Sequence, residues 1–253
     1  MPKPEELKTG ILVVTGGSRG IGASITRAAL RRGFRVAALS RSGELPAGVE
    51  PYADRVTAVA SDLNNEEQVR ECFAALDARF GQIRALVNNA GIHRAGVSAR
   101  TKSDDFESIL QTNTVAAFKA MRECYPYLKR EGGVVINIGS IFETLGAAQN
   151  ASYSASKAAL SALTRSLASE WSRDGIVLLN VAPGYVATDM NTDYLARTEV
   201  TEYFARQTMI GRPAQADEVG DLVAGLLDLD LTLLTGQTLR ADGGHSVAHG
   251  HLR

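Results

Sequence analysis

The sequence predicts one α/β domain built on a doubly wound parallel sheet of seven strands. Three observations indicate this fold class. Short runs rich in Val, Ile and Leu alternate with stretches of helical periodicity. The first six runs are apolar on both faces, as is typical of strands buried in a parallel sheet. No repeat, low-complexity tract or Pro/Gly-rich linker divides the 253 residues, so a single domain is the simplest account.

The predicted strands and helices alternate along the chain. The strands lie in runs that begin at Gly10, Arg35, Val56, Ala85, Gly133, Val177 and Gly236. The helices occupy residues 21–32, 66–80, 103–130, 153–174 and 216–229. Repetition of a strand and then a helix indicates right-handed crossovers with helices on both faces of the sheet. Ligands of such folds bind beyond the carboxyl ends of the strands, so the irregular segment 188–212 is a candidate substrate lid.

Composition argues against nucleic-acid and membrane binding. The formal net charge is -1 and no basic stripe is visible, whereas a nucleic-acid or anionic-membrane surface would be basic. No apolar run of about 18 residues occurs and the N-terminus has no apolar signal core, so we expect a cytoplasmic protein. Cys72 and Cys124 have no ligand-type spacing, which predicts packed thiols and no metal site.

A glycine-rich turn follows the first predicted strand. In VVTGGSRGIG, the residues Gly16, Gly20 and Gly22 have the spacing Gly-x-x-x-Gly-x-Gly. Glycines let a backbone turn tightly and approach a pyrophosphate, which amide N–H groups and the helix N-terminus can hold. A P-loop would require Lys and Ser/Thr where this chain has Ala23 and Ser24. The turn is therefore predicted to hold a dinucleotide phosphate; the alternative is a tight strand-to-helix connection without a ligand.

The residues after the second strand bear on the choice of cofactor. A carboxylate there would accept hydrogen bonds from the 2′-hydroxyl of NAD, whereas an arginine would pair with the 2′-phosphate of NADP. This chain has Ser40 and Arg41 at that point, and Arg19 lies inside the glycine turn. Two arginines and no acid favour NADP(H) over NAD(H). The alternative is that both arginines are solvated surface residues.

The stretch YSASKAALSALTRSL places Tyr153 and Lys157 four residues apart, and therefore on one face of a helix. A phenol is a proton donor whose pKa of ~10 is high for exchange near neutrality. A nearby cation lowers such a pKa. The spacing therefore places a proton donor beside a fixed positive charge, and alanine and serine fill most of the positions around them.

The glycine turn, the NNAG at 88–91, Ser140, Tyr153 and Lys157 together resemble the short-chain dehydrogenase/reductase family over about residues 9–247. The resemblance implies a Rossmann fold and a catalytic tetrad of Asn113, Ser140, Tyr153 and Lys157. In this family the serine binds the substrate carbonyl and the tyrosine is the general acid. The lysine also holds the nicotinamide ribose, and the asparagine bends its helix and holds a water linked to the lysine.

The resemblance also implies where the cofactor binds. The expected residues are Gly16, Ser18, Arg19, Gly20, Ile21, Gly22, Ser40, Arg41, Asp62, Leu63, Asn89, Ala90, Gly91, Tyr153, Lys157, Pro183, Gly184, Val186 and Thr188. Asp62 matches the family's adenine-contacting acid, or else belongs to a helix N-cap region. The segment 88–91 matches the one beside the adenosine ribose, and 183–188 matches the loop that borders the nicotinamide amide.

Within the family, the chain most resembles the 3-oxoacyl-acyl-carrier-protein reductases and related carbonyl reductases. The expected reaction is NADPH-dependent reduction of a 3-oxoacyl thioester or related ketone to a secondary alcohol. Lys129, Arg130 and Arg173 lie where those reductases present cations to an acidic acyl carrier protein. Glu143 departs from the small apolar residues usual after the serine, which keeps open a dehydrogenase of a polar secondary alcohol, such as a sugar acid, a polyol or a specialised metabolite. A third alternative is a non-catalytic NADP-binding regulatory protein, which usually shows a broken tetrad.

The family resemblance extends to assembly. Segments 103–130 and 153–174 correspond to the family's main subunit contacts, and the last helix and strand form a second contact. A homotetramer is therefore expected. The tail 248–253 extends past the last predicted strand.

Overall fold

The computed structural model describes residues 2–188, 195 and 197–248, and its sheet has seven parallel strands in the order β3-β2-β1-β4-β5-β6-β9. The strands are β1 (Ile11–Thr15), β2 (Arg35–Ser40), β3 (Val56–Ala60), β4 (Ile83–Asn88), β5 (Gly133–Ile138), β6 (Ile176–Pro183) and β9 (Thr238–Ala241). The predicted doubly wound sheet is confirmed. The strand order reverses between β1 and β4, which makes the carboxyl ends of these two strands the switch point where ligands bind in such folds.

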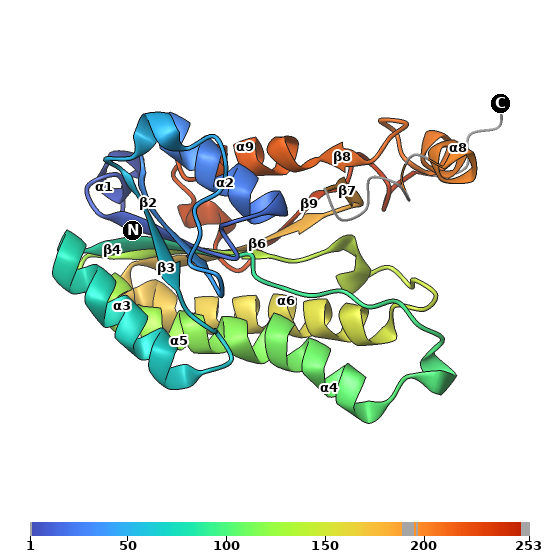
Figure 1. Cartoon of the computed structure of the whole chain (residues 1–253), viewed down its shortest axis with the longest axis horizontal. Helices are drawn as coiled ribbons and strands as arrows, with labels where there is room; N and C mark the ends of the chain where they lie inside the picture. The colour runs from blue at the N-terminus through green and yellow to red at the C-terminus, as the bar shows by residue number, and fades with distance from the viewer. Residues whose placement is uncertain (1, 189–194, 196, 249–253) are drawn as a thin grey trace.

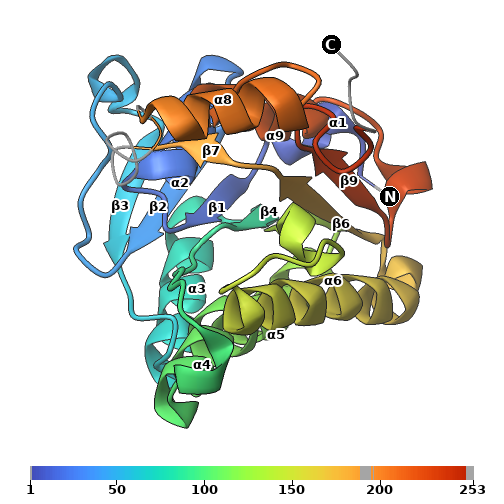
Figure 2. The ribbon, with the colours of Figure 1, turned by 90° about the vertical axis from the view of Figure 1, so that its right-hand side faces the viewer.

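Helices cover both faces of the sheet (Figure 1). One face carries α2 (Gly20–Arg31) and α9 (Ala216–Leu226); the other carries α3 (Glu66–Phe80), α5 (Ala116–Leu128) and α6 (Ala151–Trp171). The short α1 (Pro4–Leu7) precedes the sheet, and α4 (Ser103–Leu110) leads toward α5. Beyond the carboxyl ends of the strands lie α8 (Thr198–Gln207) and the small sheet of β7 (Val186–Ala187) and β8 (Ala214–Gln215) (Figure 2). The sheet is thus the middle layer of three, and its carboxyl edge is the side covered by α8.

Alternate residues of each strand feed two separate cores, one on each face of the sheet. In β1, Leu12 and Val14 pack under α2 and α9, whereas Ile11 and Val13 pack under α3 and α5. All five residues of β1 are buried, because a central parallel strand has helices on both sides. Cys72 and Cys124 are buried free thiols of the second core, as the sequence predicts. No helix among the described residues is long and apolar enough to cross a membrane.

Two predicted helices differ in detail from the structure. The helix expected over 103–130 is interrupted by a π-helical turn, Gln111–Val115, between α4 and α5. A π turn inserts one extra residue into the helical repeat without breaking the helix, so the apolar pattern continues across it. The helix expected over 153–174 is α6, which begins two residues earlier and ends in a single 3-10 turn, Ser172–Asp174.

The segment 188–212 is more regular than predicted where it is described. It contains α8, whose inward face consists of Val200 and Phe204, four residues apart and both buried. Two apolar positions in ten residues give too weak a period to predict a helix from sequence. Residues 189–194 and 196 of the candidate lid, and 249–253 of the tail, lie outside the described residues.

The close contact of α2 with α9 depends on Gly220. A Cβ at this position would lie 2.6 Å from the backbone carbonyl carbon of Ser24, whereas a Cβ at Gly225 in the same helix would meet only the end of the flexible Arg32 side chain, at 3.4 Å. We expect Gly220→Ala to lower the free energy of unfolding by about 1 to 3 kcal/mol through overpacking. Gly225→Ala should be neutral or raise it by up to about 1 kcal/mol through helix propensity.

Urea unfolding of the two variants beside the unmodified protein measures the difference. Equal stability of the two alanine variants would contradict this account of how α2 and α9 pack.

Candidate active site

The glycine turn connects β1 to α2 in a backbone conformation that needs glycine. Gly16 and Gly20 have φ angles of +65° and +54°, in the left-handed region that other residues rarely adopt. A Cβ at Gly22 would lie 2.1 Å from the carbonyl oxygen of Gly16. The turn is therefore closed onto the first turn of α2, with Ser18 and Ile21 in the same segment. The N–H groups of that first turn have no partner within the helix, which suits an anionic ligand.

The end of β4 is tied to the end of β1 beside the glycine turn. The hydroxyl of Thr15 accepts hydrogen bonds from the backbone N–H groups of Asn89 at 3.0 Å and Ala90 at 3.1 Å. The Asn89 side chain donates to the carbonyl oxygens of Thr15 at 3.1 Å and Gly16 at 3.3 Å. These four contacts span the switch point of the sheet, so the predicted residues of the 88–91 segment and the glycine turn form one continuous surface.

The remaining predicted cofactor residues lie at the same carboxyl edge. Pro183 ends β6, Gly184 follows it, and Val186 belongs to β7. A Cβ at Gly20 would lie 3.8 Å from the Cγ2 atom of Thr188, so the loop after β6 reaches the glycine turn. Asp62 and Leu63 follow β3, and Asn65, not Asp62, caps α3 by accepting from the N–H groups of Glu67 and Gln68. Asp62 is not the N-cap itself, but its side chain accepts from the Asn64 N–H at 3.0 Å in the turn that precedes the cap, as the alternative of an N-cap region residue expects.

The two arginines beside the expected ribose site remain unpaired. Arg19 and Arg41 are both exposed, and neither forms an ion pair with the part of the chain that the structure describes. The turn after β2 is organised by Ser40, whose hydroxyl accepts a hydrogen bond from the Gly43 N–H at 3.1 Å. Both guanidinium groups are thus available to an anion at the end of β2.

Tyr153 and Lys157 lie in the first two turns of α6, beside the end of β5. Lys157 is 4% exposed. Its ammonium donates a hydrogen bond to the carbonyl oxygen of Ile138 at 2.7 Å and lies 5.7 Å from the ring centre of Tyr153. Ser140 follows β5, and its hydroxyl accepts a hydrogen bond from the Phe142 N–H at 3.2 Å. The structure therefore brings these three predicted catalytic residues to one point.

Asn113 joins the group from the π-helical turn. Its side chain accepts from the Ile92 N–H at 2.8 Å and donates to the Ile92 carbonyl oxygen at 2.9 Å. It also donates to the Ser156 hydroxyl at 3.0 Å. A methyl group at Gly91 would lie 3.1 Å from Oδ1 of Asn113 and 3.7 Å from Nζ of Lys157, so Gly91 separates the two polar groups. The extra residue of the π turn directs Asn113 toward the site, as such turns do at many functional sites.

The electrostatics of the pair differ from the sequence-based prediction. Burial raises the pKa of Tyr153, and a hydrogen bond with Ser140 acts in the opposite direction. The pKa of Tyr153 is therefore raised, not lowered as the sequence predicted, because burial is the larger effect. Burial lowers the pKa of Lys157 itself to about 8, and the carboxylate of Glu143 opposes this shift.

Aromatic side chains surround Tyr153 that the sequence-based prediction missed. The rings of His93 and Phe142 meet the Tyr153 ring edge-on, with centres 4.9 and 6.3 Å away. Tyr185 contacts Phe142 at 5.6 Å and Phe204 of α8 at 5.0 Å. A row of aromatic contacts thus connects the phenol to α8. In the sequence, His93 lies close to the NNAG motif and Tyr185 follows the Pro-Gly motif. Their closeness to these motifs could have indicated that both rings lie near the site.

The predicted carrier-protein cations lie elsewhere. Lys129 pairs with Asp174 at 3.1 Å and Arg130 with Asp77 at 2.8 Å; Arg173 belongs to the turn before β6. Both segments lead into the first residues of β5 and β6, one strand length, or about 20 Å, from Ser140. The prediction that these cations lie at the active-site mouth is therefore wrong within one chain. Helices run antiparallel to the strands in this fold, so the segments that follow α5 and α6 lie at the edge of the sheet opposite to the carboxyl ends of the strands.

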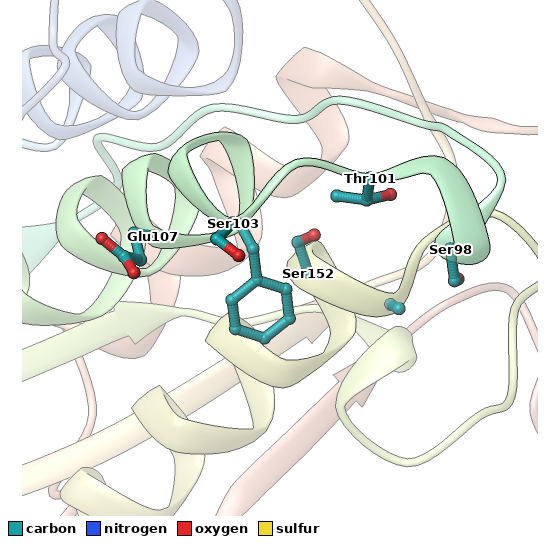
Figure 3. Close-up of a pocket in the computed structure, with 7 residues that line it drawn as sticks. Ser98, Thr101, Ser103, Glu107 and Ser152 are labelled. Carbon is teal, nitrogen blue, oxygen red and sulfur yellow. The ribbon is translucent and has the colours of Figure 1, made fainter.

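A separate cavity of about 360 Å³ lies beside the catalytic group, at the N-terminal end of α6 (Figure 3). Its polar lining consists of Ser98, Thr101, Ser103, Glu107 and Ser152. Ser152 directly precedes Tyr153 in sequence. Consecutive helical residues point about 100° apart, so the side chain that lines this cavity and the phenol leave α6 in different directions.

The family model described as "Enoyl-(Acyl carrier protein) reductase" matches residues 16–246, which includes the glycine turn and all four predicted catalytic residues. The chain belongs to the short-chain dehydrogenase/reductase family. It is similar to carbonyl reductase family member 4 of Danio rerio, with 35% identity over 92% of this chain and 97% of the relative. It is also similar to the 3-oxoacyl-[acyl-carrier-protein] reductase of Vibrio cholerae, with 33% identity over 94% and 98%. The gluconate 5-dehydrogenase of Gluconobacter oxydans is 30% identical over 93% and 94%.

Solved structures of similar proteins carry either nicotinamide cofactor. The 3-oxoacyl-[acyl-carrier protein] reductase of Brucella melitensis in complex with NAD is 29% identical, has a TM-score of 0.86 and covers 95% of this chain and 98% of that one. The structure of ElxO with NADP bound is 25% identical, has a TM-score of 0.85 and covers 94% and 99%. This family member is therefore an oxidoreductase that uses a nicotinamide cofactor.

The lowered pKa of Lys157 predicts a pH-dependent cost in stability. A fall of the lysine pKa from 10.5 to about 8 means that the charged group lowers the free energy of unfolding by about 3 kcal/mol. Lys157→Met removes this cost, but it also removes the hydrogen bond to Ile138, which contributes about 1 kcal/mol. The unfolded chain binds more protons than the folded one between pH 8 and 10.5, so the stability of the unmodified protein rises through this window. We expect Lys157→Met to be more stable by about 2 kcal/mol at pH 7, and the difference to shrink by pH 10.

Urea unfolding of the cofactor-free proteins at a series of pH values measures this difference. A gap between variant and unmodified protein that stays constant from pH 7 to 10 would show that Lys157 titrates normally.

Proposed function

We propose that the protein reduces a ketone to a secondary alcohol with NADPH, and that the substrate is a 3-oxoacyl thioester or a related carbonyl compound. The observation that carries the proposal is the convergence of Asn113, Ser140, Tyr153 and Lys157 beside the glycine turn. An intact tetrad of this kind argues against a non-catalytic regulatory protein. The names of the Danio and Vibrio relatives support the substrate class.

The described residues fit a dinucleotide. The glycine turn and the first turn of α2 would hold the pyrophosphate, Asn89 to Gly91 would border the ribose, and the free guanidinium groups of Arg19 and Arg41 would meet a 2′-phosphate. When bound, the cofactor supplies the hydride that reduces the carbonyl carbon. The three residues directly after β2 are Arg41, Ser42 and Gly43, none of which is a carboxylate that could accept from the 2′-hydroxyl of NAD, and this favours NADP(H).

The side chains then have distinct tasks in the proposed reaction. Ser140 donates a hydrogen bond to the substrate carbonyl oxygen, and the phenol of Tyr153 transfers its proton to that oxygen as the carbon receives the hydride. Burial opposes formation of the phenolate, so the nearby ammonium of Lys157 has to stabilise it. Because the pKa of Lys157 is about 8, the same group can exchange protons near neutral pH and restore the phenol.

The Gluconobacter relative supports a second candidate function, the oxidation of a sugar acid. An acyl carrier protein is the proposed partner only for the first function, where the Vibrio relative's name specifies it. The two functions are distinguished by supplying NADPH with an acetoacetyl thioester, or NADP with gluconate.

A homotetramer is part of the proposal. Phe106 of α4 and Val115 of the π turn are 37% and 38% exposed, and Leu233 before β9 is 94% exposed. These apolar side chains lie on the two surfaces that the family resemblance assigns to subunit contacts.

Removal of the phenol hydroxyl tests the mechanism. We expect Tyr153→Phe to lower the rate of NADPH oxidation with an acetoacetyl thioester at least about 100-fold, because the variant lacks the hydroxyl that is proposed to donate the proton. Tyr127→Phe is the matched control, since this tyrosine lies on α5 beside Arg130, at the far edge of the sheet. Fluorescence titration with NADPH should show that both variants still bind the cofactor.

Turnover by Tyr153→Phe at the unmodified rate would refute the proposed acid. Binding of NADPH without reduction of the thioester, together with gluconate oxidation, would favour the second function.

Reversal of charge at Arg41 tests cofactor choice. A charge-assisted hydrogen bond contributes about 1.5 to 3 kcal/mol, so we expect Arg41→Asp to raise the KM for NADPH about 10- to 100-fold while leaving that for NADH unchanged or lower. Arg79→Asp, an exposed arginine at the end of α3, is the control for net charge. An unchanged ratio of the two KM values would assign Arg41 to the solvated surface.

A further inference from the structure

Glu143 lies three residues after Ser140, and its carboxylate is hydrogen-bonded within the protein. Its Oε2 atom accepts a hydrogen bond from Nδ2 of Asn180 at 2.8 Å. Asn180 is a fully buried residue of β6 that also donates to the hydroxyl of Thr238 on β9, at 3.1 Å. The carboxylate is therefore linked through one amide to the interior of β6 and to the first residue of β9. This hydrogen bond engages one of the two carboxylate oxygens of Glu143 within the protein.

The hydrogen bond between Glu143 and Asn180 lies against the backbone of Gly139, between Ile138 and Ser140. A Cβ at Gly139 would lie 2.7 Å from Oε2 of Glu143 and 2.7 Å from Nδ2 of Asn180. Gly139 stands between Ile138, whose carbonyl oxygen holds Lys157, and Ser140. Its own N–H donates to the Val181 carbonyl oxygen at 2.7 Å. Because Gly139 has no side chain, the Glu143 carboxylate and the Asn180 amide have room to form their hydrogen bond next to this residue.

The Glu143 carboxylate is also close enough to act electrostatically on the lysine. Burial lowers the pKa of Lys157, and Glu143 is the charge that opposes this shift. Among the described residues, the polar groups that face Lys157 are otherwise uncharged at neutral pH: Tyr153 on its own helix, Asn113 of the π turn and the backbone at Ile138 and Gly91. Asn180 and Thr238 behind the carboxylate are neutral too.

We propose that Glu143 is a positioning residue that, through Asn180, holds the Ser140 turn against β6 and keeps a negative charge behind Lys157. The proposal rests on the proposed function only in assigning the reaction in which Ser140 and Lys157 act. It has two separable parts. The hydrogen bond to Asn180 fixes the turn, and the charge keeps the lysine protonated.

Three variants separate the two parts. Glu143→Gln keeps an oxygen that can accept from Asn180 but removes the charge. Glu143→Ala removes both. Glu107→Gln is the matched control, because it removes an exposed carboxylate from α4, beside the outer cavity and outside the catalytic group.

The first measurement is the pH dependence of kcat and kcat/KM for NADPH oxidation with the acetoacetyl thioester. If Lys157 must be protonated, the rate falls above its pKa, and loss of the Glu143 charge moves that fall to lower pH. We expect a shift of about one pH unit in Glu143→Gln, with kcat unchanged at pH 6 and KM unchanged throughout. Glu143→Ala should show the same shift and an additional, pH-independent fall in kcat of about tenfold. Glu107→Gln should match the unmodified protein.

Two results would overturn the proposal. A raised KM with an unshifted pH profile in Glu143→Gln would make Glu143 a substrate ligand. An equal loss of activity in both Glu143 variants at every pH, without a shift of the pH profile, would show that Glu143 has a structural role only and does not act on the charge of Lys157.

Failure of the proposed function is distinguishable from failure of this inference. If the unmodified protein reduces no ketone, urea unfolding of the cofactor-free proteins from pH 6 to 10 reports on Lys157 directly. Glu143→Gln lowers the folded-state pKa of the lysine further, so stability should begin to rise with pH about one unit earlier than in the unmodified protein. Coincident pH profiles of the two proteins would refute the electrostatic part without reference to catalysis.

Discussion

The hydrogen bond from Lys157 to the Ile138 carbonyl oxygen is the constraint around which the site is organised. It places an ammonium group in the protein interior, where burial works against the charge. Every neighbour must therefore be small, polar or both. Gly91 leaves room between the Lys157 ammonium and Asn113. Ser156, directly before Lys157 in α6, accepts a hydrogen bond from the Asn113 side chain through its hydroxyl.

The parallel sheet turns this local contact into a site. Because all seven strands run the same way, their carboxyl ends meet at one edge. The reversal of strand order between β1 and β4 opens that edge, and Thr15 ties the two strand ends together by accepting from Asn89 and Ala90. The glycine turn after β1 and the predicted catalytic Ser140 after β5 are thus two strands apart, close enough to contact one extended ligand.

Glu143 shows how one substitution in a familiar pattern changes the balance of charges. A carboxylate placed beside an active site usually suggests a contact with substrate, but here the buried amide of Asn180 competes for it. The proposed positioning role gives Lys157 a negative charge in its surroundings. The same ammonium lies over the Tyr153 ring.

The sequence by itself determined the order of strands and helices, the glycine turn and the spacing of Tyr153 and Lys157, because each follows from local periodicity or from conformations that only glycine adopts. It also predicted which residues meet at the carboxyl edge. It did not determine the π turn at Asn113, the inward rotation of Glu143 or the remote position of Lys129 and Arg130. These depend on contacts between segments far apart in the chain, such as Glu143 with Asn180. No local pattern encodes such contacts, so only the tertiary structure decided them.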